Sequence, residues 1–300
     1  MEAAAFYQLS RPEVAQIVRD AEVKTCVFPI NGTRRWFMLE REARQEKDDD
    51  WDDYVDVMVE THIDLYRMFF EHGVYTLLTP VFGPDLMDRG EEYTKMALDA
   101  LALAATSPEF LAFYEEYQIR VSLYGDYRKY LANTQFAYLI DLFDEVKRKT
   151  ASYQRHRLFY GAFAHDATET IAELGIRYHA EHGCVPDKRT LVEMYYGEYV
   201  DPVSFFIGFD KFSAFDMPLV TTGNEDLYFT VSPSLYLSEQ QLREILYDHI
   251  YSRRAEDTDY SELSPEGWAA MRNFYNANRC KTLGVGARHP AGGYWYPLHI

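Results

Sequence analysis

The chain has 300 residues, 47% of them hydrophobic and 26% charged, and its formal net charge at pH 7 is −18. This composition is typical of a globular protein, and we expect residues 1–300 to form a single domain. The excess of acidic side chains repels nucleic acid and anionic membranes, so we expect neither as a partner.

No segment resembles a targeting or membrane-spanning element. The first residues lack the basic start and the apolar run of a signal peptide. No run of about 18 apolar residues predicts a transmembrane helix. Cys26, Cys184 and Cys280 are too far apart in the chain to indicate a disulfide framework or a zinc site. We therefore expect a cytoplasmic protein.

Six short segments rich in β-branched and aromatic residues are bounded by turn residues, which is typical of buried strands. The segments are 23–30, 74–82, 119–124, 158–164, 204–209 and 227–231. Between most of them lie helical patterns, the clearest running from Val55 to Phe69 with a stop at Gly73. Capping residues mark further helix starts at Ser107, Asp166, Ser238 and Ser264. This alternation predicts an α/β fold around a mostly parallel sheet, with its ligand site at the carboxyl ends of the strands.

The stretch FPINGTRRWF, residues 28–37, follows the first predicted strand and so falls at this edge of the sheet. Gly32 allows the backbone to approach a ligand closely, and the amides of residues 32–34 are suited to bind phosphate oxygens. Arg34 and Arg35 can add charge-assisted hydrogen bonds to the same oxygens. The alternative is that both arginines pair with acids on the surface. Spacing alone leaves both interpretations open, because the chain has no Walker-type loop.

An acidic stretch, KDDDWDDY at residues 47–54, has the DDxxD spacing with which all-helical terpene synthases hold Mg²⁺ on a diphosphate. Two sets of aspartates fit this spacing: Asp48, Asp49 and Asp52, or Asp49, Asp50 and Asp53. The stretch precedes the helical pattern, however, and residues 40–53 hold eight acids and three bases. This balance favours a solvated loop that leads into a helix, with a metal site as the alternative.

Three other features carry weaker signals. The stretch GVGAR, residues 284–288, lacks the third glycine and the following helix of a dinucleotide-binding loop. His165 and Asp166 form either a polar pair or the N-cap of the next helix. The 25 tyrosines, 19 phenylalanines and 4 tryptophans allow an aromatic-lined cavity that would stabilise a carbocation, although half-buried positions account for most of them.

Several longer segments match one protein family in order along the chain, from residue 23 to residue 286. They are FPINGTRRWFMLE, FEHGVYTLLTPVFGPDLMDRGEEY, LYGDYRKYL, YYGEYVD, FIGFDKFSAFDMPL, LYFTVSPSLYLSEQQLREILYDHIY and LGVG. On these motifs the chain resembles the cis-prenyltransferases, and within them the divergent branch of tuberculosinyl transferases and tuberculosinol synthases. The resemblance implies a six-stranded, mostly parallel sheet surrounded by helices, and a homodimer.

The resemblance also implies roles for individual residues. The diphosphate-binding turn corresponds to Gly32, Thr33, Arg34 and Arg35. Arg89 corresponds to a second phosphate-binding arginine, and Tyr54 to a tyrosine associated with catalysis, which would position the nucleophile or accept a proton. Trp36 and Tyr93 are expected in the wall of the substrate cavity. The resemblance allows a Mg²⁺ ion on the diphosphate, but it identifies no metal ligand in this chain.

Position 31 departs from the family pattern, because Asn31 stands where the family has an aspartate linked to Mg²⁺ binding and proton transfer. An amide is a poorer cation ligand and cannot act as a base. Three interpretations follow: a natural enzyme that relies on arginines and backbone amides, an inactivating substitution, or a binding protein that has lost catalysis. The retained Arg34, Arg35 and Tyr54 favour an enzyme.

The second diphosphate site of the family is also altered. Chain-elongating members hold isopentenyl diphosphate with arginines, and the corresponding stretches here read FFIGFDKFSAFD and FAHDAT. We therefore expect an enzyme that ionises an allylic isoprenoid diphosphate of C20 size and releases pyrophosphate without chain elongation. Water, adenosine, an internal alkene or proton loss would quench the cation. The alternative is a non-catalytic isoprenoid-binding or partner subunit, whereas a phosphate-monoester hydrolase lacks a visible nucleophile.

Overall fold

The computed structural model describes residues 1–44, 51–253 and 260–298, without the side chains of residues 44, 51–54 and 56. The strands are β1 (Thr25–Val27), β2 (Thr76–Phe82), β3 (Ile119–Tyr124), β4 (His156–Ala162), β5 (Val203–Phe209), β6 (Asp226–Thr230), β7 (Gly286–Arg288) and β8 (Trp295–Pro297). The α-helices are α1 (Ala3–Tyr7), α2 (Arg11–Asp20), α3 (Thr33–Arg44), α4 (Trp51–Glu71), α5 (Glu91–Thr106), α6 (Pro108–Glu116), α7 (Tyr127–Leu131), α8 (Tyr138–Thr150), α9 (Thr168–His182), α10 (Lys188–Tyr196), α11 (Glu239–Tyr247) and α12 (Pro265–Asn278). Short 3₁₀ or π turns are η1 (Pro84–Arg89), η2 (Ser234–Tyr236), η3 (Asp248–Ser252) and η4 (Tyr260–Glu262).

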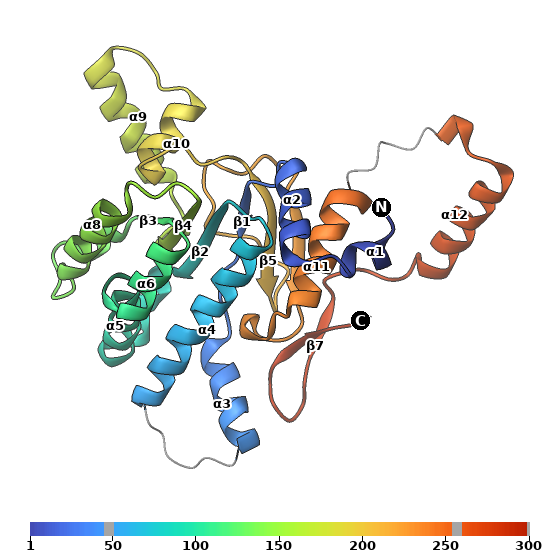
Figure 1. Cartoon of the computed structure of the whole chain (residues 1–300), viewed down its shortest axis with the longest axis horizontal. Helices are drawn as coiled ribbons and strands as arrows, with labels where there is room; N and C mark the ends of the chain where they lie inside the picture. The colour runs from blue at the N-terminus through green and yellow to red at the C-terminus, as the bar shows by residue number, and fades with distance from the viewer. Residues whose placement is uncertain (45–50, 254–259, 299–300) are drawn as a thin grey trace.

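The strands β1 to β6 form one sheet in the order β3-β4-β2-β1-β5-β6, and every neighbouring pair is parallel. Figure 1 shows this sheet among the helices. The predicted strands are confirmed, but β1 is shorter than predicted. Phe28 still donates a backbone hydrogen bond to Leu78 (2.9 Å), whereas Pro29 has no amide hydrogen to continue the ladder. The chain therefore leaves the sheet and enters the turn at Gly32.

Side chains along the strands alternate between two separate cores. In β1, Cys26 faces the larger core and Val27 the smaller one, and Leu77 and Leu78 of β2 repeat this alternation. Helices α2, α4, α5, α6, α8 and α11 contribute to the larger core, whereas α10 and the loop 214–220 contribute to the smaller one. The sheet is thus buried on both faces, as its continuously apolar strands require.

Local hydrogen bonds account for the predicted helix boundaries. The hydroxyl of Ser107 accepts a hydrogen bond from the Phe110 amide (3.2 Å) and caps α6. Side-chain caps are also confirmed at Ser238 and Ser264. Helix α4 ends just before Gly73, which has φ +93° and whose added Cβ would lie 2.6 Å from the Ala15 carbonyl oxygen. Only glycine fits that position.

The acidic stretch 40–53 is helical at both ends, so the prediction of a solvated loop is wrong for residues 40–44, whereas residues 51–53 begin a helix as the predicted lead into one requires. Residues 40–44 belong to α3 and residues 51–53 to α4, while residues 45–50 lie outside the described residues. The sequence patterns missed α3 because half of its 12 residues are charged and its apolar residues are consecutive, which leaves no helical period. The DDxxD interpretation stays untested, because Asp48 to Asp50 and the side chains of Asp52 and Asp53 are not described.

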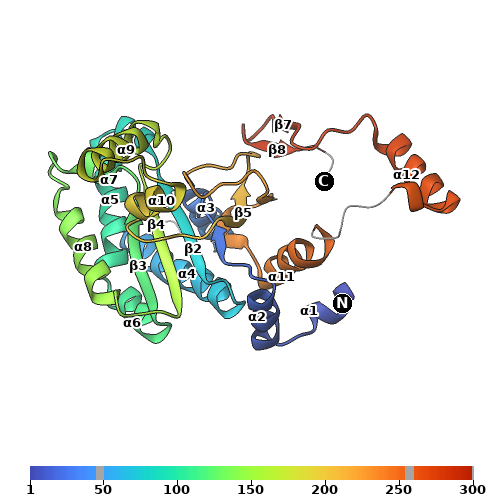
Figure 2. The ribbon, with the colours of Figure 1, turned by 90° about the horizontal axis from the view of Figure 1, so that it is seen from above.

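Helix α12 lies apart from the sheet (Figure 2). Helix α12 has no buried residue, and Trp268, Phe274 and Tyr275 on it are exposed. Figure 2 shows α12 well separated from the helices that cover the sheet. Strands β7 and β8 form an antiparallel hairpin that the sequence patterns missed. Its first strand uses the end of the GVGAR stretch, so Gly286 belongs to a hairpin strand and Gly284 to the turn before it.

In the described part of the chain, no single helix is long and apolar enough to cross a membrane. The bent pair α5 and α6, which meet at 44°, reaches the necessary length and composition only jointly. Both helices place apolar residues in the larger core, among them Leu98 and Phe113.

Candidate active site

A cavity of about 880 Å³ lies at the carboxyl ends of β1, β2, β4 and β5. Most of its polar lining residues follow these strands, and most of its apolar lining comes from α4, α5 and aromatic side chains. The volume lies toward the upper end of the roughly 300–1,000 Å³ that is usual for small-molecule sites. A cavity therefore lies at the edge of the sheet where a ligand was predicted.

The turn after β1 is held against the 3₁₀ turn η2. The Asn31 amide donates to the Ser234 hydroxyl (3.0 Å), and the Ser234 amide donates to the Asn31 carbonyl (3.1 Å). The same hydroxyl donates to the Pro29 carbonyl (3.2 Å). Gly32 has φ +78°, and an added Cβ would lie 2.8 Å from the Phe209 ring. The glycine predicted from the motif is thus required by both backbone conformation and space.

Helix α3 begins immediately after this turn, at the cavity wall. The Trp36 amide donates to the Gly32 carbonyl (2.9 Å), which closes the first turn of the helix. Asn31, Gly32 and Thr33 all line the cavity. Backbone amides in the first turn of a helix have no partner within the helix and bind anions well. The wall therefore presents a helix N-terminus to any ligand in the cavity.

Arg34 and Arg35 lie on this first turn, but neither is among the residues that line the cavity. Both side chains are exposed. The Arg35 guanidinium lies 3.6 Å from the Asp210 carboxylate and 5.3 Å from the centre of the Phe209 ring. The structure therefore brings the two arginines to the turn without directing them into the cavity. Their assignment to the diphosphate stays a prediction.

Arg89 does line the cavity, on the turn η1 that follows β2. Its guanidinium contacts the Asp85 carboxylate (2.5 Å) and donates to the Tyr93 hydroxyl (3.4 Å), and it lies 5.5 Å from the centre of the Tyr93 ring. The hydrogen bond to Asp85 raises the pKa of Arg89. Asp85 and Tyr93 line the cavity as well, so a fixed positive charge is available there to an anionic ligand.

The two other predicted residues have different positions. Trp36 packs against the larger core, with its ring centre 6.2 Å from that of Tyr236, and it does not line the cavity. Tyr54 lies in α4, but its side chain is outside the part of the chain that the structure describes. The role of Tyr54 therefore stays a prediction from the family resemblance.

Neutral tyrosines form part of the cavity wall. The rings of Tyr66 and Tyr160 meet edge to face, with their centres 6.2 Å apart, and both line the cavity. The Tyr160 hydroxyl shares a hydrogen bond of 2.8 Å with the Tyr114 hydroxyl behind it. Burial raises the pKa of all three phenols, so they stay protonated at neutral pH. Such rings stabilise a carbocation through their π faces.

The sequence patterns missed one acidic residue of the cavity. Asp216, on the loop after β5, lines the cavity although its side chain is only 5% exposed. Its Oδ1 lies 3.6 Å from Nδ1 of His165 and has no hydrogen-bond partner among the residues described. Burial raises the pKa of Asp216 to about 6. The only sequence signal was an acid enclosed by apolar residues in the stretch FSAFDMPL.

His165 and Asp166 contact different parts of the molecule. The Asp166 carboxylate accepts hydrogen bonds from the amide (3.0 Å) and hydroxyl (2.6 Å) of Thr168, where α9 begins. The N-cap of α9 is nevertheless Ala167, so the N-cap prediction is wrong by one residue, although Asp166 does bond to the first residue of the helix. His165 instead lines the cavity and faces Asp216.

Replacing Asp216 with asparagine is expected to stabilise the protein at pH 8 but not at pH 4. The pKa of about 6 in the folded state lies above the ordinary value of 3.8, so the folded state binds the proton more tightly. That advantage is lost as the pH rises from about 4 to about 6. Above this range the buried charge costs up to about 3 kcal/mol, at about 1.36 kcal/mol per pKa unit. Urea unfolding of both proteins at the two pH values measures the effect, and equal stabilities throughout would contradict it.

The residues that line the cavity do not form a metal cage. In residues 1–44, 51–253 and 260–298, no group of three or more His, Cys, Asp or Glu side chains could hold a metal ion. Asp85 is already engaged by Arg89, and Asn31 offers only a neutral amide oxygen. A protein-bound Mg²⁺ site therefore does not fit the described residues.

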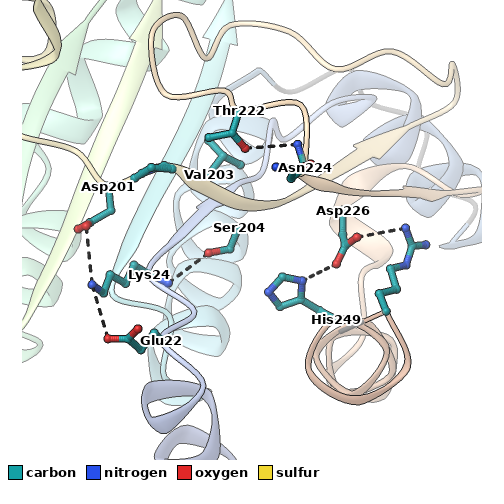
Figure 3. Close-up of a pocket in the computed structure, with 11 residues that line it drawn as sticks. Glu22, Lys24, Asp201, Val203, Ser204, Thr222, Asn224, Asp226 and His249 are labelled. Carbon is teal, nitrogen blue, oxygen red and sulfur yellow. Dashed lines mark hydrogen bonds and ion pairs between the residues drawn. The ribbon is translucent and has the colours of Figure 1, made fainter. Parts of the chain in front are cut away.

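A second pocket, of about 360 Å³, lies at the opposite, amino-terminal ends of β1, β5 and β6 (Figure 3). Its charged side chains pair with one another: Lys24 lies 3.8 Å from Asp201, and Asp226 lies 2.6 Å from His249 and 3.4 Å from Arg253. Parallel sheets bind ligands at their carboxyl ends instead. We therefore place the active site in the larger cavity.

Solved structures share the fold. Lavandulyl diphosphate synthase from Lavandula x intermedia, in complex with dimethylallyl diphosphate, matches with a TM-score of 0.60 and 14% identity over 78% of this chain and 95% of that one. A probable undecaprenyl diphosphate synthase from Campylobacter jejuni matches with a TM-score of 0.57 and 14% identity, over 79% and 97% of the two chains. The predicted six-stranded cis-prenyltransferase fold is confirmed.

Sequence relatives extend the likeness over nearly the whole chain, although no protein-family model matches it. Tuberculosinyl adenosine transferase from Mycobacterium tuberculosis (strain CDC 1551 / Oshkosh) is 43% identical over 293 residues, which are 97% of this chain and 96% of the relative. (+)-Kolavelool synthase from Herpetosiphon aurantiacus is 24% identical over 288 residues, which are 93% and 91% of the two chains. With this fold and cavity, the protein is an enzyme of the prenyltransferase and terpene synthase class. The chain belongs to the tuberculosinyl adenosine transferase family.

Proposed function

We propose that the protein ionises an allylic isoprenoid diphosphate, releases pyrophosphate and allows the cation to be quenched without chain elongation. The observation that carries this proposal is the cavity of about 880 Å³, which joins the N-terminus of α3 to a lining of neutral aromatic and apolar side chains. An anionic group at one end and a hydrocarbon at the other match these two surfaces. The family relationship supports the same chemistry.

Negative charge develops on the leaving group as the carbon–oxygen bond breaks, so groups that stabilise this charge accelerate the reaction. Thr33, at the start of α3, and Arg89 line the cavity, and the amides of this helix start together with the Arg89 guanidinium would supply such stabilisation. Arg34 and Arg35 begin the same helix and add two further positive charges beside the turn. The remaining carbocation would lie among the rings of Tyr66 and Tyr160, which exclude water.

Chain elongation needs a second diphosphate site, and the described residues give it little support. In the two stretches that replace the family's arginines, the basic residues that line the cavity are His165 and Lys211. We propose that the substrate has C20 size and that water, adenosine, an internal alkene or proton loss completes the reaction. The names of the two relatives, an adenosine transferase and a kolavelool synthase, support these outcomes. Tyr54, at the start of α4, would position the nucleophile.

The experiment is incubation of the purified protein with C5, C10, C15 and C20 prenyl diphosphates, each with and without adenosine. Pyrophosphate release is measured by a coupled assay and products are identified by mass spectrometry. We expect release from the C20 substrates, with a product that contains no added isopentenyl unit. Elongated diphosphates, or no pyrophosphate from any substrate, would overturn the proposal.

A second candidate function is a non-catalytic isoprenoid-binding subunit, and Asn31 is the observation that favours it, because an amide cannot replace the acid of the family. The Asn31→Asp variant in the same assay separates the candidates. Turnover by the unmodified protein supports the enzyme. Turnover by the variant alone indicates a chain whose catalysis is disabled at position 31. Tight substrate binding without turnover by either protein supports the binding subunit.

We also propose that Mg²⁺ enters with the substrate, held chiefly by its phosphate oxygens, as is usual for this hydrated ion. The lack of a three-residue metal cluster in the described part of the chain supports this arrangement.

Residues 1–300 are proposed to act as one catalytic domain, which the single six-stranded sheet supports. A cytoplasmic location is proposed on the grounds given by the sequence.

A homodimer is proposed from the family resemblance, and α12 supports it. A helix with three exposed aromatic side chains and no buried residue leaves apolar surface without cover. We propose that a second copy of the chain covers it.

Light scattering is expected to give twice the 35.1 kDa mass of one chain. The double variant Phe274→Glu, Tyr275→Glu is expected to be a monomer. Ile176→Glu on α9, 71% exposed, is the control, and a monomeric unmodified protein would contradict the proposal.

A further inference from the structure

His62 is a polar residue on the face of α4 that lines the cavity. The lining residues of this helix are Val55, Met58, Val59, His62 and Tyr66, whose spacing of three and four places them on one face. The others offer the cavity aliphatic groups or a neutral phenol. His62 therefore brings a titratable nitrogen heterocycle into a largely apolar wall.

One hydrogen bond fixes the protonation pattern of the His62 ring. Its Nδ1 lies 2.6 Å from the carbonyl oxygen of Met58, one helical turn earlier. A carbonyl oxygen can only accept, so Nδ1 carries the hydrogen, and in the neutral ring Nε2 holds a lone pair. Nε2 is on the opposite side of the ring from that bond, and among the described residues the Met58 carbonyl is the one hydrogen-bond partner found for the ring. The ring meets Tyr66 edge to face, with centres 6.2 Å apart.

The surroundings keep this imidazole uncharged. Burial lowers the pKa of His62, against a smaller opposing effect of the Met58 carbonyl, so the ring is neutral at pH 7. The other titratable groups that line the cavity are Tyr66, Asp85, Arg89, Tyr93, Tyr160, His165, Lys211 and Asp216. The three tyrosines on that wall are phenols, and phenols are poor bases.

The remaining candidates for a base differ from His62 in charge, partner or exposure. Asn31 cannot accept a proton, and the Asp85 carboxylate is held by Arg89. His165 is 68% exposed and faces the carboxylate of Asp216. His62 alone among these combines a neutral nitrogen, a defined lone pair and a position on the apolar wall where the hydrocarbon would lie.

We propose that Nε2 of His62 accepts the proton that is released when the allylic cation is quenched. This inference rests on the proposed function. When water or an amine attacks the cation, its lone pair forms the new bond to carbon, and its proton passes to Nε2. When the cation instead loses a proton from the neighbouring carbon, the electrons of that C–H bond form the alkene. In both cases the imidazolium then releases its proton to solvent or to the departing pyrophosphate.

A weak base is sufficient for this step. A protonated alcohol or a carbocation is a far stronger acid than imidazolium, so transfer to His62 is downhill. A neutral ring also adds no positive charge that would oppose ionisation of the substrate. The environment of His62 therefore suits a proton acceptor that must be unprotonated when the cation forms.

The test compares two histidines of the same helix. His72 makes the same kind of bond, with Nδ1 2.7 Å from the Met68 carbonyl, but its Nε2 lies 3.3 Å from Glu239 and it does not line the cavity. We expect His62→Gln to lower kcat by roughly 10²-fold or more with little change in KM, as for loss of a general base. His62→Phe keeps an aromatic ring without a base, and we expect the same loss of kcat from it. His72→Gln should retain kcat, and thermal melting verifies that each variant is folded.

The pH profile provides the readout that a purely structural role would not change. In the unmodified protein kcat should fall at acidic pH, because protonation of Nε2 removes the base, and the fall should lie below the ordinary histidine value of about 6.5 because burial lowers the pKa of His62. This acidic limb should vanish in His62→Gln, and added imidazole should restore part of the activity of His62→Ala. Long-range ¹⁵N–¹H correlation should show the Nδ1–H form of His62 at pH 7.

The outcomes separate the two proposals. An unmodified protein that releases no pyrophosphate from any prenyl diphosphate overturns the proposed function and this inference together. Turnover that His62→Gln and His62→Phe both retain, with the acidic limb unchanged, overturns the role of His62 alone. An Nε2–H or charged ring at pH 7 overturns it as well, independently of activity.

Discussion

Replacing both Arg34 and Arg35 with alanine is expected to abolish pyrophosphate release, with a loss of about 10³-fold or more in kcat/KM. Each guanidinium adds a positive charge to the first turn of α3, beside Gly32 and Thr33, which line the cavity. Loss of a single group that stabilises developing negative charge typically costs about 10²- to 10³-fold. The stability of the fold should change little, because both side chains are exposed. Steady-state pyrophosphate release with a C20 diphosphate is the measurement.

Two comparisons make this result specific. Arg41→Ala removes a positive charge from the same helix at a residue that lies over the Phe37 ring and does not line the cavity, and it should leave turnover largely intact. Lysine at positions 34 and 35 keeps the charge but loses the planar fork, so we expect an intermediate rate. Full turnover by the double alanine variant would show that the exposed arginines seen in the structure never reach the substrate.

Replacing Ala97 with tryptophan is expected to lower kcat/KM for a C20 diphosphate by roughly 100-fold, the effect of displacing a substrate by about 1 Å or more. Three alanines of α5, Ala97, Ala100 and Ala104, line the cavity, and their small side chains leave the space that a long hydrocarbon needs. An indole at position 97 would fill part of that space. A C5 or C10 diphosphate should be affected less, because it needs less of the cavity.

Ala102→Trp is the matched control for this prediction. Ala102 lies on the same helix and is half-buried against the same core, but it does not line the cavity. Any general cost of placing an indole on α5 should therefore appear in both variants, and thermal melting measures it. If the two variants lose activity with C5 and C20 substrates to the same degree, the cavity does not hold the hydrocarbon.

The position of the active site could be predicted from the sequence, because it depends on local rules. The strand before residue 28 and the glycine at position 32 place a ligand-binding turn at the carboxyl edge of a parallel sheet. The structure adds that this turn is held by Ser234, 203 residues away from Asn31. No local pattern reports a contact of that separation.

The chemical lining of the site depended on the tertiary structure. His62 belongs to a helix that was predicted correctly, but which face of α4 meets the cavity depends on how α5 and the sheet pack against it. Asp216 appeared as an isolated acid in an apolar stretch, and only the fold places it beside His165. For Arg34 and Arg35 the sequence indicated charge at the turn, whereas the structure shows both side chains outside the cavity lining.

The sequence by itself determined the six strands, several helix ends and the turn at Gly32, because hydrophobic period, capping residues and backbone conformation act over a few neighbouring residues. Motifs shared along the chain determined the family. Tertiary structure decided which side chains share the cavity, which charges are already paired and how α12 lies relative to the sheet. These properties arise from packing between distant segments, and burial then sets the protonation of groups such as Asp216 and His62.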